Sequence, residues 1–160
     1  MLRPDVTLES LHARQAGTLP GRFGLVVTRL EEERLDAEVP IEPWMLAPNG
    51  YLHAASLLLL ADTAAGYACM AHLPEGAKNF TTIELKSNFL GTVRDGKIRT
   101  ECRAEHLGRT TQVWSCVVRP RCSATHSERI LPSRALPRKL LFSSIVVKFF
   151  AFSGRWAKLA

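Results

Sequence analysis

The chain has 160 residues, which is enough for one domain with a hydrophobic core of its own. Apolar residues make up 46% of the sequence and charged residues 22%, and both proportions are ordinary for a soluble globular protein. The first nine residues hold no apolar run behind a basic start, so we expect no secretory signal.

Charge is distributed unevenly along the chain. Residues 1–118 carry 12 Lys and Arg against 14 Asp and Glu, a balance of −2, whereas residues 119–160 carry 9 against one, a balance of +8. Such a shift marks a boundary, a binding arm or a segment of different origin. The four cysteines form no close Cys-x-x-Cys pair, which argues against a zinc knuckle and predicts buried or inert, reduced thiols in a cytoplasmic protein: Cys69, Cys102, Cys116 and Cys122.

The N-terminal part predicts a short helix followed by a hairpin. The helix covers Thr7–Gln15 and ends before the Thr18-Leu-Pro-Gly punctuation. Phe23–Leu30 is rich in strand-forming residues, and Arg34–Ile41 alternates apolar with charged residues. The three glutamates between these runs form a turn, so the two runs predict an antiparallel hairpin.

Residues 54–71 form the longest apolar stretch of the chain. The stretch is rich in Ala and Leu and poor in β-branched residues, which predicts a helix. Because it is apolar almost all round, we expect the helix to be buried. Three strand-like runs follow, separated by turn signals: Thr81–Leu90, Lys97–His106 and Thr110–Val118. The order predicts an α+β fold in which one helix packs on a strongly curved antiparallel sheet.

Asp62 is the only charged residue within this apolar stretch. A lone carboxylate is costly to bury unless it is paired or hydrogen-bonded, and Asp is a poor helix former. The residue therefore indicates a nucleophile or general base with a perturbed pKa. A solvent-facing Asp and an Asp capped by a neighbour such as Thr63 remain alternatives, and a membrane span is disfavoured by a charge at its centre.

His53 precedes Asp62 by nine residues. On an α-helix this separation corresponds to about 13.5 Å of rise and half a turn of rotation, so the two side chains cannot meet on one helix. They can share a site only if the helix pairs with a second, antiparallel copy. The helix start also offers unpaired backbone N–H groups near Ala54 and Ala55, which suit a developing oxyanion.

The segment Gly50-Tyr-Leu-His-Ala-Ala-Ser-Leu-Leu-Leu-Leu-Ala-Asp-Thr-Ala-Ala-Gly66 resembles the central motif of the PaaI-like (phenylacetate-type) hotdog-fold acyl-CoA thioesterases. Thr82–Leu90, Gly96 and His106–Trp114 resemble the strands that follow, and the resemblance covers about residues 17–118. It implies the hotdog fold, in which a curved antiparallel sheet wraps one long central helix.

The resemblance also implies roles for the residues of the motif. The family has His-Gly-Gly at the helix start and an Asp or Glu nine residues after the His, and here Ala54 and Ala55 replace the two glycines. In this scheme the N–H near Ala54 polarises the thioester carbonyl and His53 assists. Asp62 of the neighbouring subunit then attacks directly or activates water.

The substrate implied by the resemblance is an aryl- or medium-chain acyl-CoA, hydrolysed to a free acid and CoA by a cytoplasmic homodimer or homotetramer. No metal or bound cofactor, no nucleic acid and no membrane partner is expected. A non-catalytic module that binds acyl-CoA or an acyl-carrier protein is the alternative. Further substrate-binding residues implied by the resemblance are Asn49 and Gly50 in the pocket loop, Thr82, Ser87 and Asn88 along the acyl or pantetheine path, and Arg109 for a CoA phosphate.

The resemblance ends near Val118. We therefore divide the chain into a hotdog domain, 1–118, and an atypical basic tail, 119–160, that we expect to be partly disordered. One hypothesis is that the tail is read in a shifted frame or replaces a native final strand, and a basic arm for an anionic membrane or partner is the alternative. If the tail is a replacement, the Ser144–Phe152 run has the β-branched and aromatic content to fill the vacated strand position.

Overall fold

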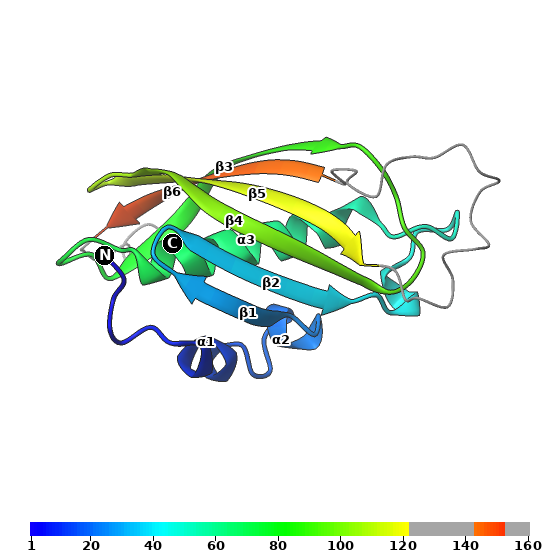
Figure 1. Ribbon diagram of the computed structural model, residues 1–160, viewed down its shortest axis with the longest axis horizontal. Helices are drawn as coiled ribbons and strands as arrows, with labels where there is room; N and C mark the ends of the chain where they lie inside the picture. The colour runs from blue at the N-terminus through cyan, green and yellow to red at the C-terminus, as the bar shows by residue number, and fades with distance from the viewer. Residues whose placement is uncertain (122–142, 153–160) are drawn as a thin grey trace, which may run out of the picture.

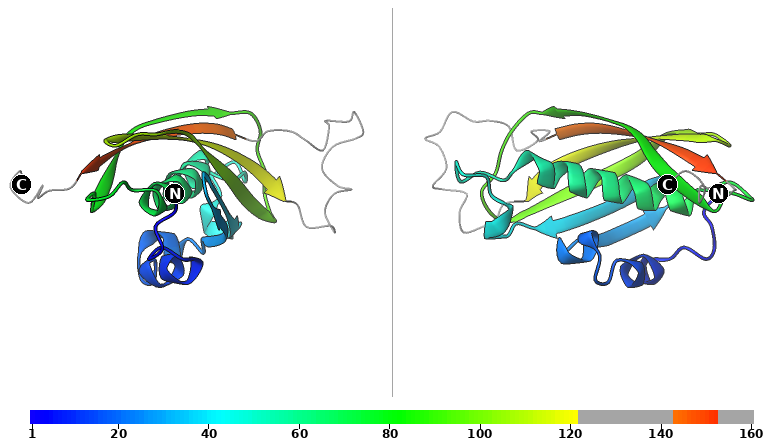
Figure 2. Two further views of the ribbon diagram at one scale, coloured as in Figure 1. Left: turned by 60° about the vertical axis from the view of Figure 1, so that its left-hand side comes forward. Right: turned by 180° about the vertical axis from the view of Figure 1, so that it is seen from behind.

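The computed structural model describes residues 1–121 and 143–152. A six-stranded antiparallel sheet, in the order β1-β2-β4-β5-β6-β3, curves over one long helix, α3 (Figure 1). A turned view shows the sheet arching over one side of α3 while the short N-terminal helices lie below (Figure 2). The predicted α+β architecture, one central helix wrapped by a curved antiparallel sheet, is confirmed.

The N-terminal segment packs beside the first strand. Helix α1 (Leu8–Arg14) begins with a capping box in which Thr7 and Ser10 satisfy each other's backbone N–H groups. A single helical turn, α2 (Leu19–Arg22), follows where the sequence predicts only a helix-breaking segment. A 3-10 turn, η1 (Pro43–Met45), likewise lies inside the predicted loop before α3.

The predicted hairpin is formed by β1 (Val26–Glu31) and β2 (Arg34–Pro40), which pair antiparallel with an irregularity between Val27 and Arg29. The alternating apolar and charged residues of β2 lie on opposite faces of the sheet. The apolar residues Leu35, Ala37 and Val39 are fully buried on the face toward the core. The charged residues between them lie on the outer face, so the pattern places one side of the hairpin in the core.

Helix α3 spans Ala54–Ala71, as the sequence predicts. It is the one helix of the described residues that is long and apolar enough to cross a bilayer, and 56% of its apolar window is buried inside the protein. It contacts five strands, β2 to β6. Its apolar composition therefore serves the core, where Leu60, Ala61 and Ala64 are fully buried.

The remaining strands are β3 (Asn79–Phe89), β4 (Lys97–Leu107), β5 (Thr111–Arg121) and β6 (Ser143–Phe152). The strands β4 and β5 form a long hairpin that pairs with β2 on one side and β6 on the other. Strand β3 pairs with β6 and is an edge of the sheet.

Two parts of the compositionally distinct segment belong to this sheet. Strand β5 continues past Val118 to Arg121, and β6 lies between β5 and β3. Its alternate residues Ile145, Val147 and Phe149 are fully buried against α3. The partial disorder that we predict within 119–160 stays a prediction, because residues 122–142 and 153–160 lie outside the described residues, and the origin of the segment stays a hypothesis.

The prediction of reduced cysteines is wrong for one pair. Cys102 and Cys116 face each other across β4 and β5, with 4.2 Å between their Cα atoms, and form a disulfide. A separation of 14 residues gives no sequence motif, because the pairing depends on the hairpin register. Cys69 is a free, buried thiol, and burial raises its pKa to about 12. Cys122 lies outside the described residues.

Candidate active site

The start of α3 is fixed by His53. This residue is the N-cap, and its Nδ1 accepts a hydrogen bond of 3.1 Å from the N–H of Ala55. An acceptor nitrogen carries no proton, so the neutral ring holds its proton on Nε2. The side chain is exposed. His53 therefore presents an N–H donor to solvent beside the helix start.

One backbone donor at the helix start remains open. The N–H of Ala55 is taken by the His53 ring, and the N–H of Ser56 donates to the His53 carbonyl at 2.9 Å. The N–H of Ala54, the first helical residue, has no hydrogen-bond partner within the described part of the chain. Ala54 and the His53 ring thus offer two donors next to each other, a pair suited to a carbonyl oxygen that gains negative charge.

Asp62 lies in the middle of α3 and is half-buried. Its Oδ1 accepts a hydrogen bond of 3.1 Å from the hydroxyl of Thr82 on β3. Burial raises the pKa of Asp62 above its ordinary value, and the Thr82 hydrogen bond opposes this shift. A half-desolvated carboxylate with one hydrogen bond is more basic than a solvated one, as a nucleophile or general base requires.

The two halves of the predicted site do not meet within one chain. His53 caps the first turn of α3, whereas Asp62 lies nine residues further along, about 13.5 Å up the helix axis. Seen from behind, α3 runs along the open side of the sheet, and no described element covers this side of the helix (Figure 2).

Of the predicted path residues on β3, two share a side with Asp62. On the neighbouring strand β6, Phe149 lies opposite Thr82 and Ile145 lies opposite Ser87. Both of these β6 residues are fully buried on the helix side. Directly opposed residues lie on the same face of a sheet, so Thr82 and Ser87 face the helix. Asn88 is opposed to Ser144 and lies on the outer face, so the structure does not bring it to the others.

The loop before α3 holds Asn49 and Gly50. Asn49 accepts a hydrogen bond of 3.2 Å from the N–H of Tyr51. Gly50 has a φ of +77°, in the left-handed region that glycine adopts without strain. Both residues lie at the His53 end of α3. Arg109 lies at the opposite end, where it lines a surface hollow with residues after α3 such as Pro74.

Two features near the site have no motif in the sequence. Gly66 lies one turn after Asp62, and a Cβ at this position would come within 3.3 Å of the Phe80 ring. The glycine thus allows β3 to lie close to α3. Arg94 stacks on the Tyr51 ring, with 4.2 Å from its Cζ to the ring centroid. Both contacts join residues far apart in sequence, so only the tertiary structure reveals them.

Comparison with known proteins decides the family. The sequence profile of the thioesterase superfamily matches residues 49–121. The proofreading thioesterase EntH of Klebsiella pneumoniae is 37% identical over 114 residues, which cover 71% of this chain and 82% of that protein. The chain belongs to the thioesterase superfamily. The 1,4-dihydroxy-2-naphthoyl-CoA hydrolase of Escherichia coli is 30% identical over 112 residues, covering 68% of this chain and 79% of the hydrolase.

Solved structures agree on the fold of this thioesterase. A mutant thioesterase from Pseudomonas aeruginosa superimposes with a TM-score of 0.78 at 23% identity, over 94% of this chain and 96% of its own. A thioesterase from Haemophilus influenzae gives 0.78 at 22% identity, over 98% of both chains. The predicted hotdog-fold family and thioester hydrolase activity are confirmed. The PaaI-like subtype and the roles of individual residues stay predictions.

Proposed function

We propose that this thioesterase hydrolyses aryl- or medium-chain acyl-CoA, with Asp62 as the catalytic carboxylate. The observation that carries the proposal is a half-buried carboxylate with a raised pKa in the middle of an apolar helix. The open donors at the start of the same helix, the Ala54 N–H and the His53 Nε2–H, provide the complementary half of a hydrolytic site.

The reaction proceeds through a tetrahedral intermediate. The Ala54 N–H and the His53 Nε2–H donate to the thioester oxygen, which gains negative charge as the carbonyl carbon is attacked. Asp62 either takes a proton from the attacking water or attacks the carbon itself and forms an anhydride that water then hydrolyses. In both routes the C–S bond breaks, CoA leaves as a thiolate that takes up a proton, and the acyl group leaves as a free acid.

The site requires two chains. In a symmetric dimer, a twofold axis can bring His53 of one chain next to Asp62 of the other. This axis must pass α3 halfway between positions 53 and 62, which is between Leu57 and Leu58. Leu58 and Leu59 are only partly buried in the single chain, and Ala55 is exposed. These apolar residues on the open side of α3 are available to a second copy. We therefore propose a homodimer as the smallest active unit, and a homotetramer keeps the same paired sites.

The proposed acyl class rests on exposed apolar residues of the strand that contacts Asp62 and of the loop that follows this strand. The edge strand β3 and the loop after it expose Ile83 by 56%, Phe89 by 46% and Leu90 by 54%. An apolar acyl chain or an aromatic ring gains from burial against such residues. The Escherichia coli relative is named for a naphthoyl-CoA, an aryl thioester.

A thiol-release assay across an acyl-CoA panel tests the proposal. We expect turnover of benzoyl-, phenylacetyl- and medium-chain acyl-CoA to exceed that of acetyl-CoA by an order of magnitude or more, because each buried methylene contributes about 0.8 kcal/mol. Tight binding of all these thioesters without thiol release would instead identify an acyl-CoA binding module. Preference for acetyl-CoA would contradict the proposed acyl class.

Replacing Ala54 with Pro removes the proposed oxyanion donor without disturbing the helix. Proline is well tolerated at the first helical position, and His53 already has the extended backbone (φ −65°, ψ 135°) that a following proline requires. We expect kcat to fall about 10²- to 10³-fold, with an unfolding temperature close to that of the wild type. Stopped-flow thiol release and thermal unfolding measure the two quantities.

The matched control is Ala54→Gly, which keeps the N–H and removes only the methyl group. We expect this variant to retain kcat within a few-fold, because the donor is unchanged. Equal loss of kcat in the Pro and Gly variants would show that the side chain, rather than the N–H, matters at this position.

We also propose a cytoplasmic location, which is supported by the proposed substrates, the CoA thioesters. Disulfides are rare in reducing compartments, so thiol titration of the freshly purified protein tests this location: an oxidised Cys102–Cys116 pair in the protein as it leaves the cell would contradict it.

A further inference from the structure

The outer face of the sheet carries an excess of positive charge between β4 and β5. In the register of these strands, Lys97 faces Arg121 and Arg99 faces Arg119. Like charges directly opposite each other destabilise a strand pair by a few tenths of a kcal/mol to about 1 kcal/mol. Two such pairs follow one another on the same face, which is an unfavourable arrangement unless an anion neutralises it.

Acidic neighbours satisfy only part of this charge. Lys97 forms an ion pair of 2.5 Å with Glu38 on β2. Arg34 bridges Asp36 and Glu101, and Arg103 pairs with Glu101 at 2.7 Å. The acids of this region are therefore already engaged. Within residues 1–121 and 143–152, no ion pair is formed by the remaining cations: Arg99, Arg119 and Arg121.

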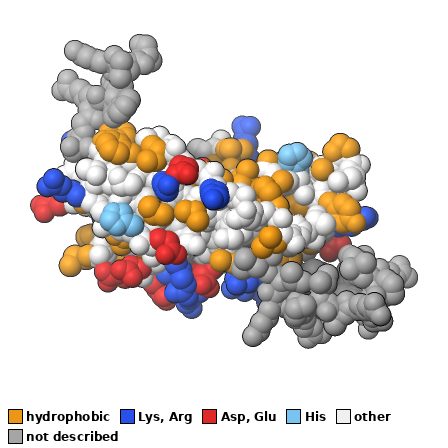
Figure 3. All heavy atoms as spheres, turned by 90° about the horizontal axis from the view of Figure 1, so that it is seen from above, with side chains coloured by type: hydrophobic (Ala, Val, Ile, Leu, Met, Phe, Trp, Pro, Cys, Tyr) orange, Lys and Arg blue, Asp and Glu red, His pale blue; other side chains and the backbone are white. Residues whose placement is uncertain are grey.

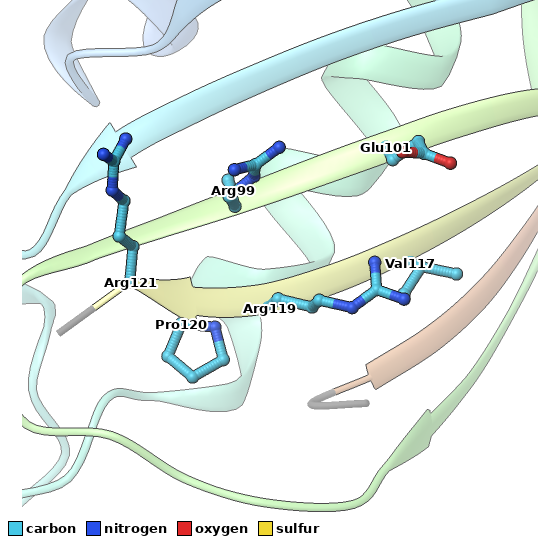
Figure 4. A pocket seen from close by; sticks show the side chains of 6 residues that line it. All are labelled: Arg99, Glu101, Val117, Arg119, Pro120 and Arg121. Atoms are coloured by element: carbon cyan, nitrogen blue, oxygen red, sulfur yellow. The ribbon is translucent and has the colours of Figure 1, made fainter. Parts of the chain in front are cut away.

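The three unpaired arginines line one hollow. Its volume is about 440 Å³, and its other lining residues are Glu101, Val117 and Pro120. The arginines come from the two neighbouring strands and lie over the same face of the sheet (Figure 4). Figure 3 shows the molecule from above, with acidic and basic side chains intermingled along its lower border. The one carboxylate in the hollow, Glu101, is held by Arg103 and Arg34, and the Arg103 hydrogen bond together with the nearby charges of Arg34 and Arg119 lowers its pKa.

We propose that this hollow is a binding site for a phosphate group. Three guanidinium groups around a shallow hollow supply the planar, forked N–H donors that bind phosphate oxygens in pairs. A dianion relieves the repulsion between Arg99 and Arg119 and also neutralises Arg121, whereas Lys97 is already paired with Glu38. The site lies on the outer face of the sheet, whereas Asp62 lies on the helix side, so it is distinct from the proposed catalytic site.

The phosphate has two chemical sources, free phosphate or the phosphorylated adenosine end of CoA. The second source rests on the proposed function, and the first does not. Binding is therefore measured directly, by calorimetry without turnover, using inorganic phosphate, adenosine 3′,5′-bisphosphate and CoA. A failure of catalysis leaves these measurements intact.

The test uses Arg119→Gln in the full-length protein, with Lys86→Gln as the matched control. Lys86 lies on the outer face of β3, opposite Val146, and its replacement removes the same charge from the same face. We expect Arg119→Gln to weaken phosphate binding about tenfold or more, since it loses a charge-assisted contact. The control should change it less than about twofold.

Thermal unfolding provides a second readout that does not depend on titration heats. In chloride, Arg119→Gln should unfold no earlier than the wild type, because it removes one like-charge pair. Millimolar phosphate, compared with chloride at equal ionic strength, should raise the unfolding temperature of the wild type and of Lys86→Gln but not of Arg119→Gln. Equal phosphate responses in all three proteins, or no phosphate binding by the wild type, would overturn the proposal.

Measurements on the wild type and Arg119→Gln also distinguish the two sources of the phosphate group. If the anion is the nucleotide end of CoA, the bisphosphate binds more tightly than phosphate, and Arg119→Gln raises KM for acyl-CoA with kcat unchanged. If it is free phosphate, Arg119→Gln weakens phosphate binding and leaves the kinetics unaltered. Both results support a phosphate site.

Discussion

Replacing Asp62 with Asn is expected to reduce kcat on the order of 10⁴-fold, with little change in KM. The amide has the size of the carboxylate and can still accept the hydrogen bond from Thr82, so the packing of α3 on β3 is retained. It can neither take a proton from water nor attack a thioester carbon. A steady-state assay of thiol release on the best substrate of the acyl-CoA panel measures both parameters.

Stability separates a chemical role of Asp62 from a structural one. Because burial raises its pKa above the ordinary value of 3.8, the folded protein binds this proton more tightly than the unfolded chain. The contribution of Asp62 to stability therefore falls as pH rises through the folded pKa. At neutral pH we expect Asp62→Asn to unfold at or above the wild-type temperature. A variant that unfolds earlier, or one with near-normal kcat, would contradict the assignment.

Hybrid dimers are expected to recover about half of the wild-type activity when the two site changes lie on different chains. One chain carries Asp62→Asn and the other carries Ala54→Pro, with two affinity tags for isolation. If each site combines the helix start of one chain with Asp62 of the other, the hybrid holds one intact site and one site with both defects. Each parent homodimer holds none.

The mirror-image hybrid is the matched control. Here one chain carries both changes and its partner is wild type, so a shared-site enzyme has no intact site and stays inactive. If instead each site were built from a single chain, the results would exchange, with activity only in this second hybrid. Sedimentation of both hybrids as dimers confirms that assembly is equal in the two preparations.

Local signals allowed prediction of the fold. The alternation in Arg34–Ile41, the Ala- and Leu-rich run at 54–71 and the turn before Lys97 each depend on neighbouring residues, and the elements form close to these bounds. The isolated carboxylate of Asp62 is also a local feature and was visible in the sequence, whereas the capping role of His53 was not predicted.

Features that depend on strand register could not be predicted in this way. Asn88 follows Ser87 directly, but the two side chains lie on opposite faces of β3. The Cys102–Cys116 contact and the opposition of Arg99 to Arg119 likewise exist only because β4 and β5 pair in one register. A shift of one residue would abolish both, and no short motif encodes it.

The position of β6 in the sheet affects when β3 can pair during synthesis of the chain. Strand β3, which carries Thr82, has no sheet neighbour other than β6 in the described structure, and β6 is encoded about 60 residues later. While the ribosome is still synthesising the chain, α3 and β3 are already present but β3 cannot yet dock through its backbone. We therefore expect the hydrogen bond from Thr82 to Asp62 to become stable only after β6 has been synthesised and has paired with β3.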